Sequence, residues 1–234
     1  MTAHSRFDRD GGRGELVASS PRNLVDDAVS ILGSRPHFYR EGWGDLGVIR
    51  EVLARFRELE DHSPGPITVR WIDLPSTRGG VTRMRGFFET PTRELPLPPE
   101  TRAAYFELVL PEGASVRLRP PVCVHLAATG DQGLWRRRQL ARPSIARGLG
   151  ALILENPYYG LRRPRDQFGM RLESVADQMM MCLAVVQEAR ALLRWLRDGG
   201  FEHVGAAGFS LGGYMAASCA ALETEPVACV PVAT

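Results

Sequence analysis

Short apolar segments alternate with helical ones from Pro121 to the end of the sequence, and this alternation restricts the fold more than any other feature. The expected strands are 122–127, 151–156, 204–209 and 227–232, and the expected helices are 136–147 (broken at Pro143), 173–198 and 211–222. Strands that are joined by helices run parallel, and strands that are apolar on both sides need cover on both faces. The pattern predicts an α/β fold, with a mostly parallel sheet and helices on both faces.

The first half of the sequence has a different pattern. Three extended segments at 67–74, 82–89 and 102–110 are separated by turns rich in glycine, proline and serine, which indicates antiparallel strands. Apolar residues at helical spacing predict helices over 21–33 and 45–60. We therefore expect a mobile tail at 1–20 and one domain at 21–234, whose parts are a helical N-terminal extension acting as a cap at 21–62, antiparallel strands at 63–112 and a parallel core at 121–234.

The composition excludes several kinds of chemistry. All 29 basic residues among the 234 are arginine, so lysine Schiff bases and a P-loop lysine are excluded. A net charge of +2 does not suggest a nucleic-acid partner. The four cysteines lie in apolar surroundings without C-x-x-C spacing, and we expect neither a metal nor an organic cofactor.

No apolar run is long enough to span a membrane, since the longest covers only 179–186. Residues 1–20 are polar and lack the apolar segment of a secretory signal. The sequence therefore predicts a cytoplasmic protein without a transmembrane segment.

The strongest chemical motif is the G-x-S-x-G sequence formed by Gly208, Ser210 and Gly212. It follows an expected strand and precedes an expected helix, which is the context of a nucleophile elbow. The residues two before and two after the serine must be small because strand and helix cross almost in contact there. The motif predicts that Ser210 is a nucleophile at a helix N-terminus, where a developing anion is favoured. The alternative is a glycine-rich turn of a flavodoxin-like sheet.

An oxyanion hole is expected beside this serine. The residue after such a nucleophile and the loop after an earlier strand each supply a backbone N–H. Here these donors are Leu211 and either Ala127 or Ala128. We expect His125, at the end of the same earlier strand, to brace the loop.

At this point three motifs indicate a family. The sequence resembles the α/β-hydrolase domain-containing protein 18 family over 38–234, through PVCVHLAATGDQGLWRRRQLARP, LENPYYGLRRPRDQ and GFSLGGYMA. The resemblance implies an α/β-hydrolase fold, a nucleophile at Ser210, and acyl-ester chemistry on small-molecule substrates that include lipids.

The expected acid and histidine of a catalytic triad are missing after Ser210. In this fold they follow the nucleophile in the chain, yet only Glu223 and Glu225 follow, and both are expected at the opposite edge of the sheet. We therefore expect a fragment that lacks the last strands, with its acid and base beyond Thr234. The sheet edge exposed in this way is expected to self-associate.

Three alternatives stay open. Ser210, His125 and Glu155 could form a local relay, because the strands of His125 and Glu155 are expected near the nucleophile. The chain could instead be a non-catalytic binding protein, or a transacylase that uses the same serine with an alcohol acceptor.

Arginines follow two of the expected parallel strands. Arg136, Arg162 and Arg163 leave the carboxyl edge of the sheet, where ligands bind in open α/β folds. Guanidinium groups suit carboxylate or phosphate, so these residues predict an anionic head group on the substrate. The alternative is that these arginines are solvated and pair with Asp131 or Asp166.

Overall fold

The computed structural model describes residues 39–60, 62–114 and 119–233, which belong to one compact unit, Tyr39–Thr234. The expected tail at 1–20 and helix at 21–33 lie outside the described residues. The helices are α2 (Leu46–Glu58), α3 (Trp135–Ile145), α4 (Val175–Asp198) and α5 (Leu211–Ala221), with 3-10 turns η1 (Pro99–Thr101) and η2 (Gly160–Arg162). The strands are β1 (Arg70–Trp71), β2 (Ser76–Arg78), β3 (Val81–Glu89), β4 (Ala103–Pro111), β5 (Val122–Leu126), β6 (Gly150–Leu154), β7 (Val204–Phe209) and β8 (Ala228–Val232).

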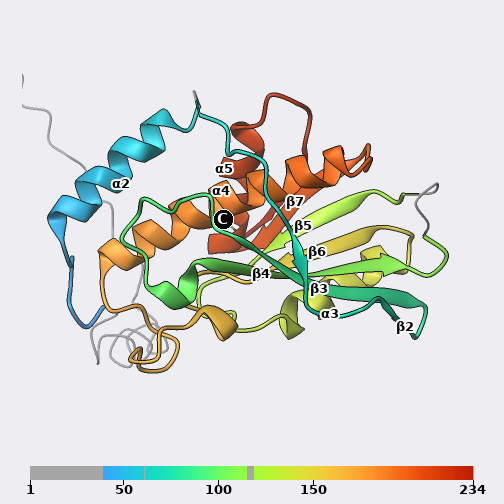
Figure 1. The fold of residues 1–234 in the computed structure, drawn as a ribbon, viewed down its shortest axis with the longest axis horizontal. Coiled ribbons are helices and arrows are strands. Elements are labelled where there is room, and N and C mark those ends of the chain that lie inside the picture. Colours follow the sequence, from blue (N-terminus) through green and yellow to red (C-terminus); the bar gives the residue numbers. More distant parts are fainter. Residues whose placement is uncertain (1–38, 61, 115–118, 234) are drawn as a thin grey trace, which may run out of the picture. The chain divides into compact units, whose positions relative to one another are not determined.

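One mixed sheet contains all eight strands (Figure 1). Its order is β1-β3-β4-β6-β5-β7-β8, and β2 pairs with β3 off this path. Strands β6, β5, β7 and β8 are parallel to their neighbours in this group, whereas β4 and the strands before it pair antiparallel. The change from a meander to strand–helix alternation in the sequence thus corresponds to the boundary between the antiparallel and parallel halves of the sheet.

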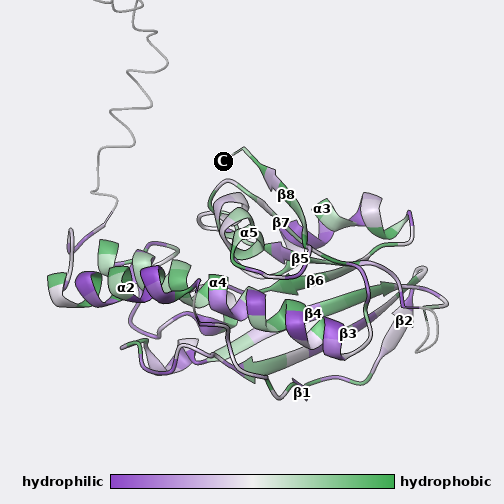
Figure 2. Cartoon of the chain, turned by 90° about the horizontal axis from the view of Figure 1, so that it is seen from above, coloured by the Kyte–Doolittle hydropathy of each residue, from purple (hydrophilic) through white to green (hydrophobic). Residues whose placement is uncertain are grey.

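Helices cover both faces of the sheet (Figure 1). On one face, α3 packs on β4 and β6 through a small cluster of Val109, Ala141, Ile145, Ala151 and Ile153. On the other face, α4 and α5 join alternate residues of the same central strands in the main core. Strands β4 and β6 are accordingly hydrophobic along most of their length in Figure 2, as a sheet that is buried on both faces requires.

Local sequence fixes the helix starts. Ser174 and Asp177 form a capping box at the start of α4, and the Asp45 side chain accepts from Gly47 N and Val48 N at the start of α2. The break expected at Pro143 does not occur, since α3 continues through it to Ile145. A proline removes one helical hydrogen bond, and the packing of α3 on the sheet keeps the helix continuous.

Two expected strands differ from the structure in instructive ways. Of segment 67–74, only Arg70–Trp71 pairs with β3. Strand β8 pairs with β7 on one side and all five of its residues are exposed, although its sequence is as apolar as that of a buried strand. Among the described residues, no helix is both long and apolar enough to cross a lipid bilayer.

Candidate active site

Ser210 lies on a strained turn between β7 and α5. Its backbone angles are φ 52° and ψ −121°, a region that non-glycine residues rarely adopt. The residue is the N-cap of α5, but its side chain makes no capping hydrogen bond, so the hydroxyl is not used to end the helix. The turn therefore holds the Ser210 hydroxyl at the carboxyl end of the parallel strands and at the positive end of a helix.

The two glycines of the motif sit where backbones nearly touch. A Cβ atom on Gly208 would lie 2.2 Å from the carbonyl carbon of Gly212, and one on Gly212 would lie 2.4 Å from the carbonyl oxygen of Leu126. No side chain fits at such distances. The first turn of α5 is therefore packed directly against the ends of β7 and β5, which keeps the serine turn in its strained form.

The same close packing brings the expected oxyanion donors to one place. Leu211 is the first residue of α5, so its N–H has no acceptor within the helix. Leu126 pairs with Gly208 in the sheet, which puts Ala127 and Ala128 level with the residues of the serine turn. The backbone of Ala127 is also 3.0 Å from the Cβ position of Gly212. The two expected donor segments are thus neighbours.

His125 and Glu155 do not form a relay with Ser210 in the structure. The Glu155 carboxylate accepts a hydrogen bond from Gly133 N at 3.2 Å and lies 3.6 Å from the Arg137 guanidinium. Burial, and to a lesser degree the nearby Arg137, lower the pKa of His125 to about 4. At neutral pH this histidine is therefore uncharged and only a weak base.

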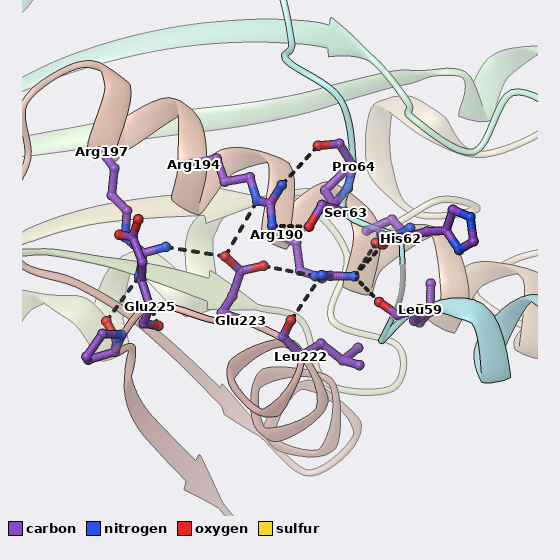
Figure 3. Close-up of polar contacts among 12 residues, drawn as sticks. Leu59, His62, Ser63, Pro64, Arg190, Arg194, Arg197, Leu222, Glu223 and Glu225 are labelled. Atoms are coloured by element: carbon purple, nitrogen blue, oxygen red, sulfur yellow. Dashed lines mark hydrogen bonds and ion pairs between the residues drawn. The ribbon is translucent and has the colours of Figure 1, made fainter.

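Glu223 is committed to a different structure at the opposite edge of the sheet (Figure 3). Its side chain is 2% exposed and lies between three arginines of α4: Arg190 at 2.9 Å, Arg194 at 3.6 Å and Arg197 at 3.3 Å. Glu225 pairs with Arg197 at 3.2 Å. Both glutamates precede β8 rather than follow it, so they lie at the edge away from Ser210.

The three arginines expected to bind substrate differ in exposure. Arg136 and Arg163 are exposed. Arg162 has no exposed surface, and its guanidinium makes two hydrogen bonds to Glu188, at 2.7 and 2.6 Å. It also donates to the carbonyls of Thr101 and Glu155. The expected contact of Arg162 with a substrate head group does not fit this position, because all of its donors serve the core.

Sequence reasoning missed a buried polar cluster beside the oxyanion loop. Asp131, Arg137 and Glu155 are each no more than 4% exposed, and they join the loops after β5 and β6. Asp131 was expected to pair with one of the exposed arginines, but it pairs with Arg137 at 3.1 Å. Exposed Phe209 and Tyr214 flank the serine turn and give its open side an aromatic surface. In the described part of the chain, no group of three or more histidine, cysteine, aspartate or glutamate side chains is placed to hold a metal ion.

The fold and the serine turn together define the class of this protein. A strained serine between a parallel strand and a helix, with glycines at both close contacts, is the nucleophile elbow of the α/β hydrolases.

The family is given by comparison with known proteins. The family model described as alpha/beta hydrolase domain containing 18 matches residues 36–234. The chain belongs to this family, as its three motifs predicted.

Solved structures show the same fold. A candidate acetyl xylan esterase from Bacteroides fragilis is 14% identical with a TM-score of 0.56, over 89% of this chain and 60% of that one. A cold-adapted esterase from an Arctic intertidal metagenomic library is 17% identical, with a TM-score of 0.47 and coverages of 65% and 60%. This chain therefore spans about three fifths of the length of these solved proteins.

Proposed function

We propose that this chain carries the nucleophile and oxyanion hole of a serine hydrolase for acyl esters. The observation that supports the proposal most strongly is the backbone strain at Ser210, together with a side chain that is not used for capping. Strain of this kind is retained where it serves a mechanism. A glycine at position 210 would relieve it, yet the sequence has a serine there.

In the proposed reaction, the Ser210 hydroxyl oxygen attacks the ester carbonyl carbon while its proton passes to a base. The carbonyl oxygen becomes an anion and accepts hydrogen bonds from the N–H groups of Leu211 and of Ala127 or Ala128. Each such donor contributes about 3 kcal/mol to transition-state stabilisation. The alcohol leaves with a proton, and water then releases the acid from the acyl-serine. The proposal assigns the nucleophile and the oxyanion donors; it does not assign the base to any described residue.

The substrate part of the proposal is an acyl ester, lipids included, that carries an anionic group. Arg136 and Arg163 support it, because both are exposed on loops that leave the carboxyl ends of β5 and β6. The aromatic surface of Phe209 and Tyr214 gives an apolar acyl chain a place to lie beside the hydroxyl. The cytoplasmic location and the self-association through β8 stay predictions.

Replacing Ser210 by alanine in the full-length protein tests the nucleophile. Turnover of p-nitrophenyl acetate and covalent labelling by a fluorophosphonate are expected to fall by roughly 10⁶-fold and to background, respectively. Ser218→Ala is the matched control, because Ser218 lies on the same helix and its hydroxyl donates to the Tyr214 carbonyl at 3.0 Å. Undiminished turnover or labelling in Ser210→Ala would contradict the proposal.

The substrate arm needs a separate comparison. Replacing Arg136 and Arg163 together by glutamine is expected to raise KM for a phosphorylated ester and to leave a neutral ester unaffected. Equal effects on the two esters would remove the anionic group from the proposal and leave the nucleophile intact.

A further inference from the structure

The two loops beside the serine turn are held together by one buried arginine. Arg137 comes from the first turns of α3 and its side chain is 2% exposed. Its guanidinium donates to the carbonyls of Gly133, in the loop after β5, and of Leu154, at the end of β6. It also contacts the carboxylates of Asp131 at 3.1 Å and Glu155 at 3.6 Å. The four acceptors are divided equally between the two loop regions.

Direct hydrogen bonds reinforce this arrangement. Gly130 N donates to the Tyr159 hydroxyl at 2.9 Å, and Gly160 N donates to the Gln132 side-chain oxygen at 2.8 Å. Together with the bond from Gly133 N to Glu155, they connect the loop after β5 to the loop after β6 along its whole length.

The connected loop is the one that begins with the expected oxyanion donors. Asp131 N donates to the Ala128 carbonyl at 3.1 Å, so the position of Asp131 fixes the peptide plane that follows Ala128. Asp131 in turn depends on Arg137. Burial raises the pKa of the Asp131 carboxyl, and the positive charge of Arg137 opposes that rise. Within the described residues, the second carboxylate oxygen of Asp131 has no hydrogen-bond partner.

We infer that Arg137 is a positioning residue that fixes the oxyanion loop of the enzyme. The inference rests on the proposed function, since it assigns Arg137 to the same reaction. Arg137 has no contact with the reacting atoms; it acts through Asp131 and Gly133, which place Ala127 and Ala128 opposite Leu211. A guanidinium is required, because a single ammonium group cannot reach acceptors on two loops in a fixed plane.

The test compares two equally buried arginines in the full-length protein. Arg190 is the matched control, since it is 1% exposed and also holds backbone carbonyls (Leu59, His62 and Leu222) and a glutamate, but at the opposite edge of the sheet (Figure 3). Arg137→Lys and Arg190→Lys are each expected to lower the melting temperature. Only Arg137→Lys should lower kcat for p-nitrophenyl acetate, by about 10- to 100-fold, with KM within about twofold of wild type. The rate of Ser210 phosphonylation by the fluorophosphonate should fall in parallel.

Equal losses of kcat in the two variants, or an unchanged kcat in Arg137→Lys, would overturn the inference. If Arg137→Lys does not fold, Tyr159→Phe decides, because it removes only the acceptor of Gly130 N. It should reduce kcat without a change in KM, and an unchanged kcat would refute the role of the connected loops. Turnover that survives Ser210→Ala refutes the proposed function itself. A dead Ser210→Ala with an unaffected Arg137→Lys refutes only the positioning role.

Discussion

The buried histidine beside the nucleophile strand predicts a specific loss of stability in acid. Burial holds the pKa of His125 at about 4 in the folded protein, against 6.5 for a solvated histidine. Between these two values the unfolded chain binds a proton that the folded chain does not. Stability is therefore complete above about pH 6.5 and falls as the pH decreases towards 4. The full shift is worth about 3 kcal/mol, of which about 2 kcal/mol is lost between pH 7.5 and pH 5.

Urea denaturation at pH 7.5 and pH 5 measures this loss in wild type and in His125→Asn. The carboxyl groups of Asp131 and Glu155 have raised pKa values, so their contribution to stability changes with pH in the opposite sense. Comparing the two proteins removes most of that contribution. The wild type should lose about 2 kcal/mol more than His125→Asn, whereas the exposed-site control His203→Asn should behave as wild type. Equal losses in wild type and His125→Asn would show that His125 is not held neutral by burial.

Two further predictions concern the packing of the site. Gly208→Ala should destabilise the fold by about 3 kcal/mol and abolish labelling of Ser210, because the new Cβ would lie 2.2 Å from a backbone carbonyl carbon of α5; melting temperature and fluorophosphonate labelling check this, and an unchanged melting temperature would contradict the close crossing. Arg162→Met should cost about 3–5 kcal/mol in urea unfolding, because it leaves Glu188 charged and buried. The double variant Arg162→Met/Glu188→Leu should recover most of that loss, and a double variant no more stable than the single one would refute the pairing argument.

The elbow and the parallel core follow from the sequence because their constraints are local. A serine between two glycines, preceded by an apolar strand and followed by a helix, satisfies a steric requirement that can be read from nine residues, GFSLGGYMA. The alternation of apolar strands and helices likewise fixes parallel pairing without knowledge of distant contacts. The strand order and the position of each loop around Ser210 follow from these two facts.

The buried arginines could not be predicted in the same way, because burial depends on a distant partner. Arg162 and Arg137 lie in polar segments that read as solvent-exposed loop and helix surface. A signal was nevertheless present in α4, where Glu188 and Arg190 interrupt an apolar stretch and are almost completely buried. A charge in the middle of a core helix requires an opposite charge elsewhere, and both partners turned out to lie outside that helix.

Pro143 shows the reverse case, in which a strong local signal loses to packing. A proline favours a helix break, but Ala141 and Ile145 on either side of it are buried against β6. The contacts of these two side chains are retained only if the helix continues. The local preference is therefore overridden by the cluster on that face of the sheet.

The nucleophile is also tied to the last strand of the sheet. The backbone N–H of Ser210 donates to the carbonyl of Val232 at 2.8 Å, although the side chains of β8 are all exposed. Because the bond joins main-chain atoms only, mutational drift can exchange the side chain at position 232 without loosening the serine turn. A shift of β8 by one residue along β7 would instead replace that carbonyl with an N–H and release the turn. Selection on this part of the active site therefore acts on strand register, and an alignment of side chains would pass over it.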